Sequence, residues 1–493
     1  MAAMTAAPTS SDSSSRPETK NGSSSSSSAD MSATLKRMQA AQRASRAPSY
    51  EARMAMLDRL EQTLLRRKDA ICDAISKDYG TRSRHESLVA EIFVVVGCIK
   101  HARANLRDWM EPQSREVGWA FLPGSAEVMY QPLGVVGIIA PWNYPVQLAL
   151  APLVGVLAAG NRAILKPSEY TPKTGELIRD LCAETFEPDQ VAVVLGGPEV
   201  GEAFAKLPFD HLVFTGSTRV GRAVMRAASE NLTPVTLELG GKSPTIVGED
   251  FSADVAATRI MMGKLFNSGQ TCVAPDYVLV PENRRDAFVE AAKAAVARMY
   301  PTLAANPDYT SIINERHYAR LRGYIDDAQS KGAKIVEMNA GESLDPASKK
   351  LAPTLVIDPT DDMLVMQDEI FGPILPVKTY KSLAEAIDYV NDHPRPLALY
   401  YFGYDREKID RVLAETISGG VSVNETMLHV VQDDLPFGGV GSSGMGHYHA
   451  FEGFEMFSKK KPVFRQSRIN ATSLLRPPFG KALNTFLRVV LGK

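Results

Sequence analysis

The spacing of hydrophobic positions changes along the chain, and each spacing predicts a different kind of element. Residues 49–78 carry apolar side chains at helical spacing, and Gly80 follows as the expected end of that helix. A second helix is expected over 85–110. Short apolar runs divided by Gly and Pro come next, with helical segments between them. The runs are EVMYQ, VVGIIAP, RAILKP, VAVVLG and HLVFTG, and the helical segments are 145–159, 173–186, 199–206 and 219–229.

The same alternation starts again after PVTLELGGKSPTIVG, residues 234–248. The predicted strands are YVLV, AKIVEM and TLVID, and the predicted helices are 252–268, 283–298, 315–330 and 382–393. This second unit is expected to end near 418–425, and no internal repeat is visible. Strands that alternate with helices favour parallel sheets covered by helices on both faces, so we predict an α/β protein.

The two ends of the chain have different patterns. Residues 1–30 are rich in serine and have no apolar core, which predicts a disordered tail rather than a secretory signal. The last stretch, FGKALNTFLRVVLGK, predicts an amphipathic helix in a tail over 466–493. That helix could dock on its own body or on a partner chain, or lie on a membrane surface.

One uncharged stretch, 128–161, is long enough to suggest a membrane span. Pro132, Pro141, Pro145 and Pro152 interrupt it, so a buried strand, loop and helix fit better, and we expect no transmembrane span.

Composition narrows the function further. The net charge of −2 in 493 residues gives no field that would attract nucleic acid or an anionic membrane. Four cysteines without paired spacing argue against a disulfide scaffold and a zinc cluster, so the reducing cytoplasm is the expected compartment. The histidines of HYH, 447–449, are interpreted as surface or interface residues, and no metal is expected.

Phosphate chemistry is suggested by HLVFTGSTRVGRAV, residues 211–224. A strand runs into Gly216 and Ser217, and a helix starts near Val220, so its first amides face the turn and favour an anion. Gly221 allows close backbone approach. The alternative is an ordinary tight turn. The literal G-x-G-x-x-G match at 439–444 follows no strand and is rejected as a dinucleotide site.

Two further turns follow predicted strands. Lys166 and Glu169, in AILKPSEYTP, could bind phosphate and ribose hydroxyls, or simply form a solvated strand end. In IIAPWNYP, Trp142 and Asn143 lie in a proline-bounded turn. The Asn143 amide could stabilise an oxyanion, or only satisfy the backbone of the turn.

Glu238 and Cys272 are candidates for covalent chemistry. Glu238 lies between two leucines on an apolar strand, where desolvation should raise the pKa of its carboxyl, as suits a general base; it could equally be the partner of a buried arginine. Cys272 lies in the polar loop NSGQTCVAP, whose amides and hydroxyls offer donors to a thiolate. The other three cysteines, Cys72, Cys98 and Cys182, fit inert core positions on helices.

Taken in order, APWN, KPSE, FTGSTRVG, LELGGKSP, GQTCVAP, EIFGP and PFGGVGSSGMG resemble the aldehyde dehydrogenase superfamily over about residues 31–465. NSGQTCVAPDY resembles the class-3 branch, and with SLLRPPFGK the chain is similar to its bacterial coniferyl aldehyde dehydrogenases. The resemblance implies a Rossmann-like NAD-binding domain over 31–114 and 137–239 and a catalytic domain over 240–430. It also implies an arm, 115–136 with 431–465, that joins two subunits in a homodimer.

The resemblance also implies roles for single residues. Cys272 would attack an aldehyde, the Asn143 side chain and the Cys272 amide would hold the oxyanion, and Glu238 would activate water to hydrolyse the thioester. A free 2′-hydroxyl suits Glu169, so NAD is expected over NADP, which remains possible. The residues expected to contact the dinucleotide are Ile139, Trp142, Lys166, Glu169, Gly216, Ser217, Gly221, Glu369 and Phe371.

The resemblance favours a hydrophobic, aromatic substrate, with coniferyl aldehyde the first choice and long-chain or aliphatic aldehydes as alternatives. Two rival functions differ in chemistry. A CoA-acylating relative would release the thioester to another nucleophile, although Glu238 argues for hydrolysis. A catalytically idle binding protein on the same fold would not need Cys272, Glu238 and Asn143 together.

Overall fold

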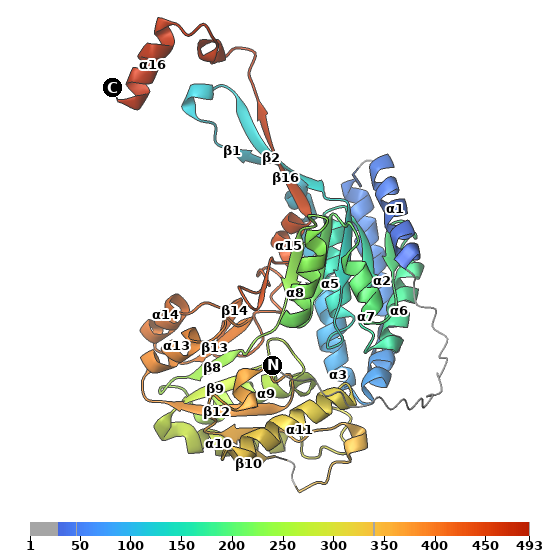
Figure 1. The fold of residues 1–493 in the computed structure, drawn as a ribbon, viewed down its shortest axis with the longest axis vertical. Helices are drawn as coiled ribbons and strands as arrows, with labels where there is room; N and C mark the ends of the chain where they lie inside the picture. The colour runs from blue at the N-terminus through green and yellow to red at the C-terminus, as the bar shows by residue number, and fades with distance from the viewer. Residues whose placement is uncertain (1–27, 46, 339–340, 493) are drawn as a thin grey trace, which may run out of the picture.

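The computed structural model describes residues 28–45, 47–338 and 341–492. The predicted tail, 1–30, lies outside the described residues as far as residue 27, and its last three residues begin a helix. Two α/β lobes lie side by side, and a thin arm extends away from them (Figure 1). The predicted α/β class is therefore confirmed.

The first lobe is built on a six-stranded sheet in the order β15-β7-β6-β3-β4-β5. All its strands run parallel except β15, which pairs antiparallel with β7. The strands are β3 (Val135–Ile139), β4 (Arg162–Lys166), β5 (Val191–Val193), β6 (His211–Thr215), β7 (Val235–Glu238) and β15 (Gly444–Met445).

Helices cover both faces of this sheet, because each has one apolar face that it must bury. Four of them, α2, α4, α5 and α6, pack together on one face, and α1, α7 and α8 gather on the other. The helices are α1 (Ser28–Ala44), α2 (Tyr50–Tyr79), α3 (Arg84–Ser87), α4 (Val94–Met110), α5 (Gln147–Ala158), α6 (Pro172–Thr185), α7 (Pro198–Ala205), α8 (Thr218–Ser229) and α15 (Ala450–Met456). A π-helical turn, Leu88–Phe93, joins α3 to α4. Gly80, with φ +89°, ends α2 as predicted.

The second lobe holds a seven-stranded sheet in the order β10-β11-β12-β9-β8-β13-β14, parallel except for β10. Its strands are β8 (Pro244–Val247), β9 (Tyr277–Pro281), β10 (Lys334–Glu337), β11 (Thr354–Ile357), β12 (Ile374–Tyr380), β13 (Ala398–Phe402) and β14 (Gly420–Val423). Its helices are α9 (Ala253–Leu265), α10 (Arg285–Met299), α11 (Glu315–Ser330), α12 (Leu364–Gln367), α13 (Leu383–Asn391) and α14 (Arg406–Glu415).

The arm is a three-stranded antiparallel sheet in the order β1-β2-β16. Its strands are β1 (Gln113–Arg115), β2 (Ser125–Pro132) and β16 (Ser458–Arg465). The C-terminal helix α16 (Lys481–Leu491) lies beyond the arm, where Phe486 contacts Trp119 at 5.6 Å between ring centroids (Figure 1).

One part of the predicted arm lies elsewhere. Strand β15 belongs to the first sheet, and α15 packs against α4 and α5, so only β16 of the segment 431–465 joins the arm sheet. The predicted domain boundaries otherwise stay a proposal.

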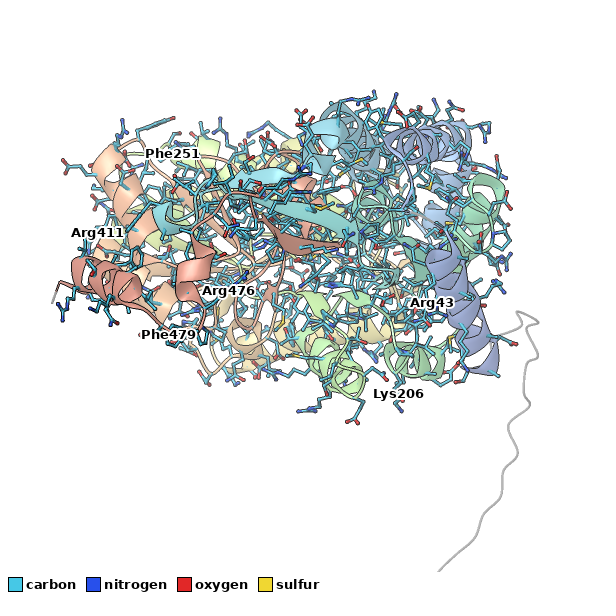
Figure 2. All side chains as sticks on the ribbon, turned by 90° about the horizontal axis from the view of Figure 1, so that it is seen from above. Arg43, Lys206, Phe251, Arg411, Arg476 and Phe479 are labelled. Carbon is cyan, nitrogen blue, oxygen red and sulfur yellow. The ribbon has the colours of Figure 1, made fainter. Side chains whose placement is uncertain are left out.

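Charged side chains cover the periphery. Arg43, Lys206 and Arg411 lie on three different sides of the molecule (Figure 2) and are exposed. No helix in the described part of the chain combines the length and hydrophobicity that a membrane crossing requires.

Candidate active site

A cleft with a cavity volume of about 230 Å³ lies where the two lobes meet. Turns that follow β3, β6 and β7 supply one wall, since the carboxyl ends of parallel strands share one edge of a sheet. Eight of the residues singled out in the sequence line this cleft: Trp142, Asn143, Gly216, Ser217, Glu238, Cys272, Glu369 and Phe371. The other four do not line it: Ile139, Lys166, Glu169 and Gly221.

The loop before Cys272 has an unusual backbone. Asn267, Ser268 and Gly269 have φ values of 52°, 51° and 75°, in the left-handed region. A Cβ on Gly269 would lie 2.2 Å from the carbonyl oxygen of Gly372, so only glycine fits there. This tight turn delivers Cys272 into the cleft.

The polar side chains of this loop hold the loop itself. Gln270 is buried; its Oε1 accepts from the Ile313 amide at 2.9 Å, and its Nε2 donates to the carbonyl oxygens of Asn267 and Ser311 at 3.0 Å. The hydroxyl of Thr271 pairs with that of Tyr144 at 2.6 Å. Of the amides and hydroxyls expected to serve a thiolate, the side-chain groups of Gln270 and Thr271 bind protein groups instead.

Two backbone amides remain beside the thiol. Those of Cys272 and Val273 hydrogen-bond to the sulfur and favour the thiolate. Burial nevertheless dominates and, with the charges of Glu369 and Glu238, raises the pKa of the Cys272 thiol to about 12. The thiol is therefore protonated at neutral pH and needs a base to take its proton.

Glu238 ends strand β7, opposite Thr215 in the parallel register. It is 1% exposed, and neither carboxylate oxygen has a hydrogen-bond partner. Burial raises the pKa of Glu238 well above its usual value. The alternative of an arginine partner for Glu238 is not what the structure shows, since both oxygens are free to meet a bound molecule.

Glu369 is the second carboxyl of the cleft. Burial, and then the nearby charge of Asp276, raise its pKa to about 8, and its Oε1 has no hydrogen-bond partner. A Cβ on Gly240 would lie 2.3 Å from the Glu369 oxygens, so glycine makes room for this carboxyl. A ligand hydroxyl would satisfy the free oxygen.

Asn143 is fixed through its backbone. Its carbonyl oxygen accepts from the Tyr79 hydroxyl at 3.1 Å, from Arg82 Nη1 at 2.8 Å and from Asn267 Nδ2 at 3.1 Å. Asn143 is 3% exposed and lines the cleft with Cys272. The turn that carries Asn143 and the loop that carries Cys272 are thus joined by a hydrogen bond.

Arg82 is in turn held by a buried ion pair that the sequence patterns did not indicate. Its Nη1 lies 3.1 Å from Glu91 Oε1, with both side chains fully buried. The other oxygen of Glu91 accepts from the amides of Val146 and Gln147, at the start of α5. Glu91, an acid within an apolar run of the predicted helix 85–110, was the sequence signal that could have indicated this buried pair.

The residues outside the cleft lie close to its first-lobe wall. Ile139 pairs with Lys166 in the sheet register, and Lys166 Nζ lies 3.0 Å from Glu169 Oε2. Ser217 precedes α8 and makes no capping hydrogen bond. A Cβ on Gly221 would lie 2.7 Å from Leu239 Cδ2, so glycine lets α8 pack closely on the end of β7. The amides at the start of α8 are therefore open to an anionic group.

Two titratable residues of the cleft, one histidine and one arginine, were missed by the sequence analysis. The His317 ring lies 5.2 Å from Trp142, and burial lowers its pKa to about 4. Arg320 donates to the carbonyl oxygens of Glu369 and Ile370 at 3.2 and 2.8 Å, which fixes the Glu369 turn. Neither residue lies in a motif, and only their position in space reveals them.

The interpretation of HYH is partly wrong. His447 is exposed, but His449 is 5% exposed and stacks on Phe437 at 5.1 Å, because α15 folds back against the first lobe. Within the described ranges no group of three His, Cys, Asp or Glu side chains could hold a metal ion.

Comparisons with known proteins agree on one family. A model of the aldehyde dehydrogenase family matches residues 15–463. A probable coniferyl aldehyde dehydrogenase of Pseudomonas aeruginosa is 55% identical over 92% of this chain and 94% of its own, and the coniferyl aldehyde dehydrogenase of a Pseudomonas species is 50% identical over 94% and 96%.

Two solved structures have the same fold. A substrate-bound state of AldH from Staphylococcus aureus is 38% identical, with a TM-score of 0.87 over 93% of this chain and 98% of its own. The NAD-dependent aldehyde dehydrogenase of Sinorhizobium meliloti is 28% identical, with a TM-score of 0.82 over 91% and 89%.

Proposed function

The chain belongs to the aldehyde dehydrogenase family, and from this we propose that it oxidises a hydrophobic, aromatic aldehyde to the carboxylic acid with NAD. Coniferyl aldehyde is the favoured substrate, because three relatives at 50% identity or more carry that name. The observation that carries the proposal is the meeting of Cys272, Glu238 and Asn143 in one buried cleft.

Cys272 is the nucleophile. Its thiol loses a proton, and Sγ adds to the aldehyde carbon to give a thiohemiacetal. The Asn143 side chain and the Cys272 amide hold the oxygen that becomes negative, and the three hydrogen bonds to the Asn143 carbonyl keep that residue in place. The thiol proton passes to solvent water, so that Glu238 is needed only for the hydrolysis that follows.

The dinucleotide fits the chain on structural grounds. Lys166 and Glu169 would hold the adenosine ribose, the amides near Ser217 the pyrophosphate, and Glu369 the nicotinamide ribose through its unpartnered Oε1. When bound, the nicotinamide supplies the acceptor for the hydride that leaves the thiohemiacetal, and a thioester remains on Cys272. The other proposed contacts are Ile139, Trp142, Gly216, Gly221 and Phe371.

Glu238 completes the reaction. As a carboxylate it takes a proton from water, the oxygen attacks the thioester carbon, and the acid leaves while Cys272 recovers its thiol. A pKa raised by burial suits this work, because it makes the carboxylate a stronger base toward water. A CoA-acylating relative would not need this base, so hydrolysis is the proposed outcome.

The test mixes the purified protein with NAD and coniferyl aldehyde and follows NADH by its absorbance. NADH formation that disappears in Cys272→Ala supports the proposal. Activity with aliphatic aldehydes alone would exclude the aromatic substrate. Acid that forms only after CoA is added would favour the acylating reaction. No NADH formation with any aldehyde would contradict the proposal.

We also propose a homodimer that forms through the arm. The arm and its 3₁₀ turn expose large apolar side chains, including Trp119 at 67%, Leu122 at 55% and Phe464 at 51%. Such a cluster on edge strands is typical of a contact surface.

All four cysteines are free thiols, which supports the cytoplasm as the compartment.

A further inference from the structure

Glu86 is a buried acid that the proposed reaction does not use. It lies on the short helix α3, is 8% exposed and does not line the cleft. Its Oε2 accepts two hydrogen bonds, from the backbone amide of Asn267 at 3.1 Å and from the hydroxyl of Thr310 at 3.0 Å. One carboxylate oxygen therefore joins α3 to the loop that carries Cys272 and to the segment that follows residue 309.

The bond to Asn267 is made where the cysteine loop needs support. Helix α9 ends at Leu265, and Asn267 and Ser268 then adopt φ values of 52° and 51°. Left-handed backbone is unfavourable for residues that have a side chain, and it persists only where surrounding groups hold it. Glu86 accepts from the first amide of this left-handed pair, and so it supports the turn that leads to Cys272.

Asn267 passes this support on to the catalytic groups. Its Nδ2 donates to the carbonyl oxygens of Asn143 and Gln270, at 3.1 Å each. Asn143 is the proposed oxyanion residue, and Gln270 lies two positions before Cys272. Glu86 is therefore at one end of a chain of hydrogen bonds that reaches both sides of the reacting centre.

The charge of Glu86 depends on its surroundings. The titratable and charged groups that act on it are Arg82, Asp308, Tyr79, Tyr144, Tyr300 and Tyr309. Burial raises the pKa of Glu86 to about 7, against the lowering effects of the Arg82 charge and of the hydrogen bonds from Asn267 and Thr310. Burial also raises the pKa of each tyrosine, so these four stay neutral, and Glu86 changes its charge near neutral pH.

We propose that Glu86 is a positioning residue for Cys272, because its carboxylate holds the Asn267 amide and so keeps the cysteine loop in the turn that delivers the thiol into the cleft. The inference rests on the proposed function only in taking Cys272 as the nucleophile. A hydrogen bond to a carboxylate is stronger than one to a neutral carboxyl or amide. When Glu86 binds a proton, the loop is held less firmly and the thiol reacts more slowly.

The test measures the rate of Cys272 alkylation by iodoacetamide in wild type and in Glu86→Gln, between about pH 5.5 and about pH 8.5, with peptide mapping to assign the label. Glutamine keeps the shape and an acceptor oxygen but cannot ionise. The ratio of the wild-type rate to the variant rate should be near one at the acidic end. It should rise to about tenfold at the alkaline end, as for the loss of one charge-assisted bond, with its midpoint near pH 7.

The ratio separates positioning from other roles. The thiolate fraction rises with pH in both proteins and cancels. A ratio that does not change with pH would mean that Glu86 only stabilises the fold, and it would overturn the proposal. A variant that reacts faster than wild type at alkaline pH would do the same, because a direct charge effect raises the pKa of a thiol. Alkylation needs neither NAD nor aldehyde, so this result is independent of the NADH assay.

Asp210→Asn is the matched control. The Asp210 carboxyl also accepts from a backbone amide, that of Val135 at 2.7 Å, and burial raises its pKa. It lies beside the start of β3, at the edge of the sheet opposite the cleft, so its ratio to wild type should not change with pH.

Thr310→Val tests the same proposal without changing Glu86. It removes a hydrogen bond that lowers the pKa of Glu86, so the carboxylate should form at a higher pH than in wild type. The ratio of the wild-type alkylation rate to that of Thr310→Val should therefore pass through a maximum just above pH 7. A ratio without a maximum would overturn the positioning role even if Glu86→Gln does not fold.

Discussion

Cys272 and Glu238 line the same cleft, and burial affects both, although one is the proposed nucleophile and the other the proposed base for hydrolysis. Burial raises the pKa of both groups above their usual values. The sequence motifs identified both residues, and Glu238 between two leucines even predicted its desolvation. They could not show that the polar side chains around Cys272 bond to the protein, because those partners, such as Ile313 and Ser311, are distant in sequence.

The raised pKa of Glu238 predicts a pH-dependent stability. The native state binds more protons at this site than the unfolded chain, so the free energy of unfolding falls as pH rises above the unfolded pKa. Gln cannot ionise, so the Tm of Glu238→Gln should rise relative to that of wild type as the pH increases above the unfolded pKa of about 4.3. Differential scanning calorimetry measures this, with the exposed Glu290→Gln as a control that should show no trend.

Glu169 should decide the choice of dinucleotide. A carboxylate near the ribose repels a 2′-phosphate, and its loss frees Lys166, 3.0 Å away, to bind that phosphate. We expect Glu169→Gln to raise kcat/KM for NADP relative to NAD by about tenfold. Glu176→Gln, which removes a solvent-exposed pair with Lys173, is the control. An unchanged ratio would show that Glu169 does not contact the ribose.

At the level of elements, the alternation of strands and helices predicted the parallel sheets and most helix positions, because those depend on local periodicity. Strand β13, an apolar run ALYYF, and helix α14 were missed although the patterns are present. The pairing of β2 with β16 and the return of β15 to the first sheet join segments more than 200 residues apart. No local pattern encodes such register.

The buried Arg82–Glu91 pair joins the π-helical turn Leu88–Phe93, the start of α5 and the Asn143 turn, and it yields a prediction. Arg82→Met leaves Glu91 buried without its partner and should cost about 3 kcal/mol or more. It also removes one of the three donors to the Asn143 carbonyl, so kcat should fall. Arg84→Met removes an exposed pair with Asp69 that solvent screens, so it should leave the stability nearly unchanged. Equal Tm values for the two variants would contradict this role.

For the whole molecule, the arm is the feature that a single chain leaves unexplained. Its exposed apolar side chains predict a dimer by size-exclusion chromatography with light scattering. Phe464→Glu should shift the protein toward the monomer, because a charge would be buried at the contact. Leu232→Glu, at an 89% exposed position in the first lobe, should remain dimeric. A monomeric wild type would contradict the proposed assembly.

The central claim is that Cys272 carries the substrate as a thioester that Glu238 helps to hydrolyse. Intact-protein mass spectrometry of Glu238→Gln, mixed with NAD and coniferyl aldehyde, tests it most directly. The account predicts that the acyl group accumulates on the chain, that peptide mapping places it on Cys272, and that Cys272→Ala in the same background abolishes it. Sustained NADH formation with no adduct, or an adduct on another residue, would contradict the account.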